Sequence, residues 1–160
     1  LMNGMTTTQF APNGTTTRAQ IVTLLWRLEG EPYAYYSMSF NDVAQGTWYT
    51  EAVRWAARNG IVDGYSDTVF APNDAITREQ MAAILFRYAQ YQGIDTAVEG
   101  DLSAFADADA VSDYAAEAMI WANQTGLILG KKADILDPQG MATRGQTAVI
   151  LHRAATNIFS

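Results

Sequence analysis

The sequence predicts an all-α domain built from tandem repeats, and three observations support this class. The segment at residues 10–20 recurs at residues 70–80 and 136–146. Each copy ends in Thr-x-x-Gln, a pattern that starts helices. Each is then followed by apolar residues at i, i+3, i+4 and i+7, the spacing of one face of an amphipathic helix. The connecting segments are short and contain glycine, so we expect loops and only brief extended pieces between the helices.

A second repeated segment defines the domain organisation. Residues 40–64, which contain Phe-x-Asp and Trp55, align with residues 105–130, with one residue inserted in the later copy. The first copy of the repeat has only its second half, so we expect the sequence to start inside that repeat. This alignment divides one structural domain into a half repeat at 1–33 and full repeats at 34–93 and 94–160.

Three helices are predicted to begin at capping boxes, in which the Thr hydroxyl and the Gln side chain each satisfy a backbone N–H. The residues that form these boxes are Thr17 with Gln20, Thr77 with Gln80, and Thr143 with Gln146. The first half of each full repeat predicts another helix. We expect Thr47 and Asp113 to cap these two helices, and Gly60 and Gly126 to end them in the left-handed conformation.

Composition excludes several functions. The net charge of -7 argues against a partner with a phosphate backbone, so nucleic acid is not expected. The chain has no cysteine and a single histidine, His152, which disfavours thiolate metal sites and His-based catalysis. No apolar run is long enough for a membrane span. We therefore expect no enzyme activity, no metal, no cofactor and no membrane insertion.

Three arginines are the main candidate ligand-binding residues: Arg18, Arg78 and Arg144 each follow directly after a Thr cap. A cation at this position opposes the helix dipole, so local helix stability does not explain it. Free backbone N–H groups beside a guanidinium would form an anion site, and the planar guanidinium matches a carboxylate. The alternative is that each arginine pairs with a neighbouring acid and locks the repeats together.

Aromatic, acidic and glycine residues complete the candidate site. Aromatic rings stack on the apolar face of a sugar, whereas helically spaced tryptophans such as Trp55 and Trp121 are expected in the core. Asp42 and Asp107 can accept sugar hydroxyls or, as is commoner for such residues, cap a loop. The glycines are expected to form turns and to allow close approach of a ligand. Besides the arginines, the candidate ligand-binding residues are Trp48, Tyr114, Tyr65, Asp42, Asp107, Gly4, Gly64 and Gly130.

The repeats resemble S-layer homology modules. The second copy carries the resemblance best, through Phe40-x-Asp42-Val, Trp48-Tyr49, Gly60-Ile61, Gly64-Tyr65-x-Asp67, Phe70-x-Pro72-Asn73 and Ile76-Thr77-Arg78. The resemblance implies a pseudo-threefold spindle of three prongs around a central bundle of the Thr-Arg helices. It also implies grooves that bind secondary cell-wall polysaccharide, often pyruvylated, and an extracellular location on the bacterial wall or S-layer surface.

The sequence departs from the family pattern at several positions, among them Asp113-Tyr114 around the usual Trp. The family's acid in Thr-Arg-Ala-Glu is Gln20, Gln80 and Gln146 here, so any ligand contact by that carboxylate is lost. Lys131 and Lys132 follow Gly130, where the family often has an aromatic and a polar residue, so we expect the grooves to differ in affinity. The half repeat is expected to leave one groove without a wall.

The leading hypothesis is a non-catalytic anchor that binds secondary cell-wall polysaccharide or a peptidoglycan-linked glycan. Two other classes stay open: a module that binds protein or an S-layer lattice, and a carbohydrate-active enzyme with a carboxylate pair. We expect further domains of the parent polypeptide to lie outside this sequence.

Overall fold

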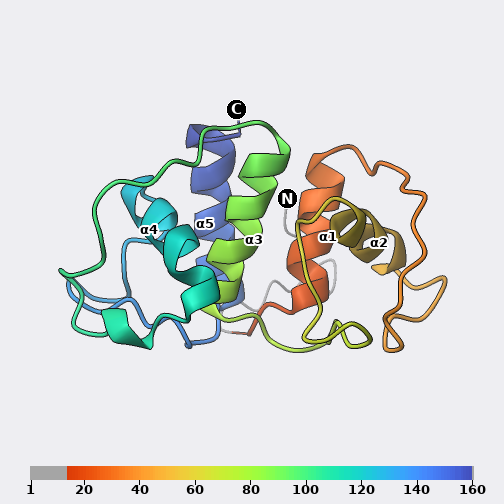
Figure 1. Cartoon of the computed structure of the whole chain (residues 1–160), viewed down its shortest axis with the longest axis horizontal. Coiled ribbons are helices and arrows are strands. Elements are labelled where there is room, and N and C mark those ends of the chain that lie inside the picture. Colours follow the sequence, from red (N-terminus) through yellow and green to blue (C-terminus); the bar gives the residue numbers. More distant parts are fainter. Residues whose placement is uncertain (1–13, 160) are drawn as a thin grey trace.

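The computed structural model describes residues 14–159 and confirms the all-α class. Its α-helices are α1 (Arg18–Leu28), α2 (Thr50–Arg58), α3 (Arg78–Tyr91), α4 (Ala116–Gln124) and α5 (Arg144–Asn157) (Figure 1). Two 3-10 helices, η1 (Ala108–Ala110) and η2 (Asp113–Ala115), precede α4. Within residues 14–159 no strand forms and β-pairing occurs only as isolated bridges, as the short loops predicted.

Helices α1, α3 and α5 begin at the predicted residues, and all three capping boxes are present. In α1 the Thr17 hydroxyl accepts the Gln20 N–H at 3.1 Å, while the Gln20 side chain accepts the Thr17 N–H at 2.8 Å. The predicted apolar faces are buried along these helices, except that Leu28 at the end of α1 is 38% exposed. The local pattern of sequence therefore sets where these helices start and which face turns inward.

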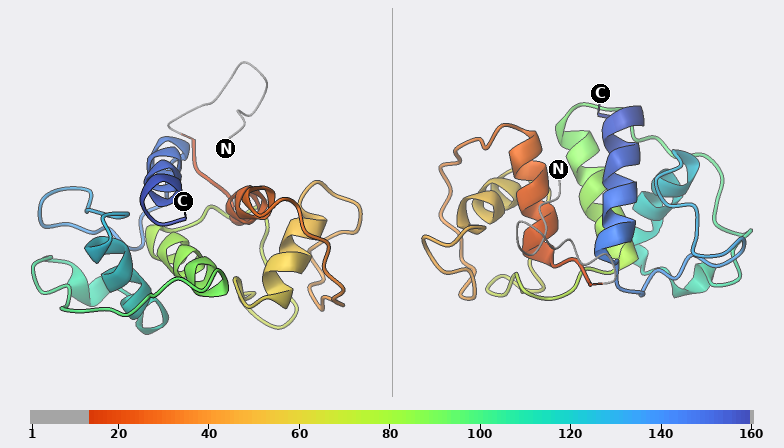
Figure 2. Two further views of the ribbon diagram at one scale, coloured as in Figure 1. Left: turned by 90° about the horizontal axis from the view of Figure 1, so that it is seen from above. Right: turned by 180° about the vertical axis from the view of Figure 1, so that it is seen from behind.

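A closed ring of backbone hydrogen bonds joins the starts of the three helices. The N–H of Thr16 donates to Ala142 O, that of Ala142 to Ile76 O, and that of Ile76 to Thr16 O, at 2.8–3.0 Å. All three residues are completely buried. Seen from above, α1, α3 and α5 surround a common centre, which gives the domain its threefold-like arrangement (Figure 2). The residue boundaries assigned to the three repeats stay a prediction.

Two prongs lie outside this central bundle. Helix α2 packs on α1, and α4 packs on α3, so each prong contacts the central helix of the repeat before it (Figures 1 and 2). Trp55 and Trp121 are each 1% exposed, which confirms the prediction that they belong to the core. Trp121 meets Phe86 of α3 edge to face at 5.6 Å. These contacts tie successive repeats into one hydrophobic core.

The predicted starts of the prong helices were wrong, although their ends were right. Helix α2 begins at Thr50 after Tyr49, which has no side-chain cap, and the Thr47 hydroxyl hydrogen-bonds the Thr50 hydroxyl at 2.7 Å instead of a helix N–H. Asp113 lies inside η2, a 3-10 turn that leads into α4. Gly60 and Gly126 follow the helix ends with φ of +71° and +79°, in the left-handed conformation that a glycine adopts without strain.

Between residues 14 and 159, no helix combines the length and the apolar character that crossing a membrane requires.

Candidate functional site

Arg18 locks the first repeat to the second. Its Nε donates to Phe70 O and its Nη2 to Asp63 O, both at 2.9 Å. The guanidinium also lies over the rings of Tyr65 and Phe70, 4.5 and 4.7 Å from their centroids. The expected alternative to ligand binding was pairing with an acid, but these hydrogen-bond partners are main-chain carbonyls of the next repeat.

The second lock repeats the hydrogen bond from the arginine Nε to a loop carbonyl. Arg78 Nε donates to Leu136 O at 2.8 Å. This hydrogen bond joins α3 to the loop of the third repeat, just as Arg18 joins α1 to the loop of the second. Arg144 is 4% exposed, and its backbone N–H donates to Gly14 O at 2.7 Å. All three arginines are therefore buried at the base of the central bundle.

The expectation of free backbone N–H groups at these helix starts was wrong for α1 and α3. The N–H groups of Arg18 and Ala19 donate to Asp74 O and Pro72 O, each at 2.9 Å. Those of Arg78 and Glu79 donate to Gly140 O and Pro138 O at 2.9 and 3.0 Å, and the next N–H in each helix is taken by its capping threonine. Any anion must therefore bind to the side chains.

Asp42 and Asp107 cap loops. The Asp42 carboxylate accepts the N–H groups of Phe70 and Ala71 at 2.9 and 2.7 Å, which holds Ala71 at a φ of +61°. The Asp107 carboxylate accepts the N–H groups of Leu136 and Asp137 at 2.9 and 2.8 Å. Phe70 and Leu136 accept hydrogen bonds from Arg18 and Arg78 through their carbonyls, and each also donates its N–H to one of these aspartates. Neither aspartate lines the grooves described next.

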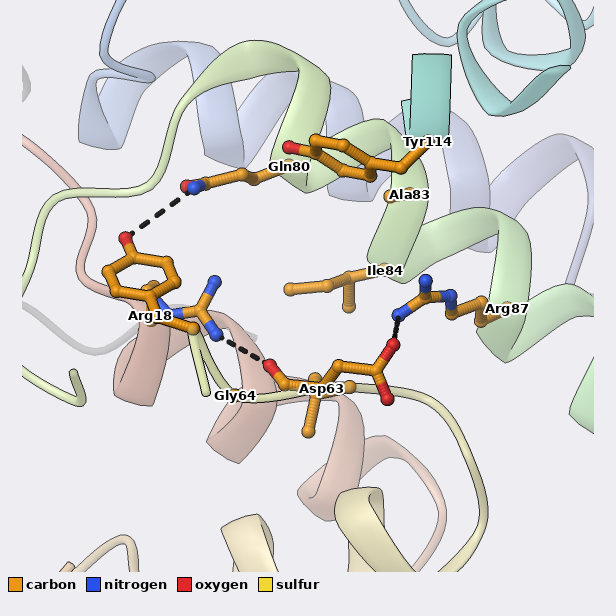
Figure 3. Close-up of a pocket in the computed structure, with 10 residues that line it drawn as sticks. Arg18, Asp63, Gly64, Gln80, Ala83, Ile84, Arg87 and Tyr114 are labelled. Carbon is orange, nitrogen blue, oxygen red and sulfur yellow. Dashed lines mark hydrogen bonds and ion pairs between the residues drawn. The ribbon is translucent and has the colours of Figure 1, made fainter. Parts of the chain in front are cut away.

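A cavity of about 370 Å³, which we call the first groove, opens between α1, the loop at residues 62–65 and α3 (Figure 3). Its lining residues are Arg18, Val62, Asp63, Gly64, Tyr65, Gln80, Ala83, Ile84, Arg87 and Tyr114. The structure therefore brings together Arg18, Gly64, Tyr65 and Tyr114, which sequence reasoning had placed in the site one by one.

Arg18 keeps donors available on the groove side. Its two hydrogen bonds use two of the five N–H groups that a guanidinium carries. The terminal nitrogen that does not reach Asp63 points into the cavity (Figure 3). The Gln80 side chain bridges the groove to Tyr65, with its Nε2 3.5 Å from the Tyr65 hydroxyl. The groove thus presents a cation, an amide and two phenol rings.

Burial affects the ionisable groups of this region. Desolvation lowers the pKa of Arg18, an effect partly offset by Tyr65 and Tyr114, and that of Arg78, where Asp137 and Asp107 partly offset it. Both guanidinium groups stay charged, because arginine titrates far above neutral pH. Partial burial, together with the Glu79 carboxylate, raises the pKa of Tyr114, so its phenol stays neutral. The first groove therefore keeps the charge of Arg18 and the neutral phenol of Tyr114 across the physiological range.

A matching cavity of about 490 Å³, the second groove, lies between α3, the loop at residues 128–131 and α5. It contains the second set of predicted residues, Arg78 and Gly130, together with Lys131. Its complete lining is Arg78, Leu127, Ile128, Leu129, Gly130, Lys131, Gly145, Gln146, Val149, Ile150 and Arg153. Among the residues that the structure describes, no counterpart of Tyr114 walls this groove.

The two loop glycines make room for backbone packing. A Cβ on Gly64 would lie 2.4 Å from Ser66 O and 2.5 Å from both Val69 O and Phe40 Cε1. Gly130 has a φ of +104°, and a Cβ there would meet Lys132 O at 2.8 Å. These contacts support the expected role in a turn, and both glycines also line their grooves.

Two other candidates lie elsewhere. Trp48 is 56% exposed, meets Tyr49 edge to face at 5.0 Å, and lines neither groove. Gly4 lies outside the described residues.

Sequence reasoning missed Arg87 and Asp63, which form an ion pair of 3.0 Å in the lining of the first groove. The missed signal was helical spacing, because Gln80, Ala83, Ile84 and Arg87 follow i, i+3, i+4 and i+7 and so share one face of α3. The loop residue Asp63 carries no pattern of its own, since its position depends on the lock made by Arg18.

A helical repeat domain with arginine-lined grooves between its repeats is a binding module. The sequence pattern of the S-layer homology domain matches residues 39–82 and 104–148. The chain belongs to the S-layer homology domain family, whose modules anchor proteins to the cell wall and are not catalytic. It is an extracellular, cell-wall-associated domain.

Relatives share this domain within much larger proteins. The chain is 36% identical over 154 residues to an amylopullulanase of Thermoanaerobacterium thermosulfurigenes, with 95% of this chain and 8% of that protein covered. It is 34% identical over 154 residues to the exoglucanase XynX of Acetivibrio thermocellus, covering 95% and 14%. It is 37% identical over 153 residues to the surface-layer 125 kDa protein of Lysinibacillus sphaericus, covering 93% and 12%. The chain therefore spans only a small part of these relatives.

Proposed function

We propose that this chain holds a larger surface protein on the bacterial envelope by binding a secondary cell-wall polysaccharide through an anionic, pyruvylated sugar. The observation that carries the proposal is the first groove, where the free donors of Arg18 face a cavity between two tyrosines. Its volume of about 370 Å³ lies within the range of small-molecule sites, roughly 300–1,000 Å³.

Each part of such a sugar has a partner of suitable chemistry. A pyruvyl ketal carries a carboxylate, which the remaining N–H groups of Arg18 can bind. The rings of Tyr65 and Tyr114, each about half exposed, offer flat apolar faces to a pyranose. Gln80 contributes an amide where an acid would repel the carboxylate. Arg18 at the base of the groove therefore attracts the carboxylate, and the tyrosines of its walls provide contact area for the sugar ring.

The same lining argues for binding without turnover. Glycoside hydrolysis uses two carboxyl groups on either side of the scissile bond. Among the described residues, Asp63 is the single acid in the lining of the first groove, and it is paired with Arg87. The part of the chain that the structure describes thus offers no pair of carboxylates facing a bound sugar there.

The test is co-sedimentation of the purified chain with wall sacculi of its source organism, before and after acid stripping of the secondary polymer. Binding that disappears on stripping is the expected result. Binding that survives would assign the ligand to peptidoglycan, and no binding at all would favour a protein or lattice partner. Either of the last two results overturns the proposal.

A matched pair of tyrosine variants assigns the groove. Tyr114→Ala removes a ring from the first groove and is expected to weaken wall binding about tenfold, which corresponds to the contact energy of one aromatic ring. Tyr35→Ala removes a ring that is 87% exposed and lines neither groove, so binding should stay at the wild-type level. Equal affinity of the two variants would remove the first groove from the proposal.

A further inference from the structure

The two grooves share one backbone frame but differ in charge. The frame positions repeat, with Gly64 matching Gly130, Gln80 matching Gln146, and Arg87 matching Arg153. Two exposed loop positions do not repeat: Leu129 replaces Asp63, and Lys131 replaces Tyr65. Both changes make the second groove more positive than the first.

In the first groove an acid offsets one of the two arginines. The Asp63 carboxylate pairs with Arg87 Nη1 at 3.0 Å, while its main-chain carbonyl accepts Arg18 Nη2. The Asp63 side chain is 76% exposed, so its charge also faces an approaching anion. Arg18 and Arg87 against Asp63 leave this lining a net charge of +1.

In the second groove the corresponding acid is absent from the described lining. Arg153 Nη1 is directed to Leu127 O at 3.4 Å, and no carboxylate takes the place of Asp63 there. Arg78, Lys131 and Arg153 give the lining a net charge of +3. Asp137, which pairs with Lys131 at 3.1 Å from outside the lining, reduces this to +2. An ammonium group also replaces the aromatic ring that Tyr65 supplies in the first groove.

We propose that the second groove binds a dianionic group, whereas the first groove binds a single carboxylate held between tyrosine rings. The inference rests on the proposed function, since it assumes that both grooves face wall polymer. The ligand class is a phosphate monoester or two adjacent carboxylates. In the first groove the second negative charge of such a group adds little binding free energy, because Asp63 repels it. In the second groove the same charge is attracted by the additional cations and strengthens binding.

Nuclear magnetic resonance tests both grooves in one sample, with the backbone amides of Gly64 and Gly130 as reporters of the two sites. The chain is titrated with inorganic phosphate, malonate and lactate at constant, low ionic strength. We expect Gly130 to respond to the dianions at about tenfold lower concentration than to lactate. Gly64 should show no such preference. A stronger response of Gly130 to phosphate than to malonate would assign a phosphate monoester, and the reverse would assign paired carboxylates.

Exchange variants supply the matched control. The double variant L129D/K131Y gives the second groove the loop residues of the first, and D63L/Y65K makes the reciprocal change. All four positions are exposed, so folding should be preserved. The first variant should abolish the dianion preference at Gly130, and the second should create it at Gly64. Equal responses to dianions and lactate at Gly130, no response at all, or a preference unchanged in L129D/K131Y would overturn the inference. Wall binding by the unmodified chain, measured separately, would still stand in those cases.

Discussion

Removing the Arg18 side chain is expected to destabilise the domain, independently of any ligand. Arg18→Ala deletes two hydrogen bonds from a charged donor, to Phe70 O and Asp63 O, and leaves carbonyls unpaired at a junction where Phe70 is completely buried. Hydrogen bonds that involve a charged group contribute about 1.5–3 kcal/mol each. Burial lowers the pKa of Arg18, so part of this gain is offset by desolvation of the guanidinium. The expected loss in the free energy of unfolding is therefore about 2–4 kcal/mol.

The measurement is urea unfolding followed by far-ultraviolet circular dichroism. The control is Arg58→Ala, an exposed arginine of α2 outside both grooves, which should change the free energy of unfolding by less than about 0.5 kcal/mol. Domains of this size are stable by about 5–15 kcal/mol, so Arg18→Ala should remain folded at room temperature. An Arg18→Ala variant as stable as the Arg58→Ala control would refute the assignment of Arg18 as the lock between repeats.

Three further changes test the loops and the capping boxes. The Leu136 N–H is the main cause that lowers the pKa of Asp107 in the folded domain. The Asp107 carboxylate therefore stabilises the folded domain fully above the unfolded-state pKa of about 4, and this contribution is lost as the pH falls through the lower folded-state pKa. Asp107→Asn should therefore be less stable than wild type at pH 7, with a difference that shrinks below about pH 4 in urea titrations. Gly64→Ala should lower the free energy of unfolding by about 2–4 kcal/mol, because its Cβ would lie 2.4 Å from Ser66 O. Gly100→Ala, where the Cβ would meet open space at a φ of +80°, should lower it by about 1 kcal/mol. Equal urea midpoints for the two variants would contradict the packing argument. Gln80→Glu should stabilise α3 by about 0.3–1 kcal/mol, because a carboxylate at a helix start interacts favourably with the helix dipole. It should also weaken wall binding about threefold, because the new carboxylate repels an anionic ligand. Tighter wall binding would contradict the proposal of an anionic ligand.

The sequence predicted what local interactions determine. A capping box involves residues three apart, so the starts of α1, α3 and α5 could be predicted to the residue. The glycines after α2 and α4 could be predicted for the same reason. Thr47 looked equally suitable as a cap, but it pairs with the Thr50 hydroxyl, and propensity alone does not distinguish these two hydrogen bonds.

The sequence predicted which residues belong to the candidate site, but it did not predict how they are arranged in space. Arg18, Tyr65 and Tyr114 were selected one at a time, and the fold brings them to one groove from three repeats. The partners of Arg18 could not be predicted, because Phe70 and Asp63 accept through main-chain carbonyls. Every residue has such a carbonyl, so the residue type does not indicate which one is used. The same limit explains the wrong expectation of free N–H groups, since Asp74 and Pro72 supply carbonyls from the neighbouring repeat.

The arginine lock explains why the proposed binding site lies at a junction between repeats. Arg18 stands on α1, while the carbonyls that orient it belong to the second repeat, so the guanidinium is fixed only when both repeats are folded against each other. A ligand that binds the remaining N–H groups must therefore favour the docked arrangement and stabilise it by mass action.

The positions that build this junction have few alternatives, because the Thr cap, the arginine, the Gln and the loop glycine each satisfy a backbone requirement. Positions 63 and 65 project from the loop and are exposed, so their counterparts at 129 and 131 can change the charge of a groove without disturbing its frame. Duplication of one repeat thus yields grooves with the same backbone frame, and the exposed loop residues give the two grooves different charges.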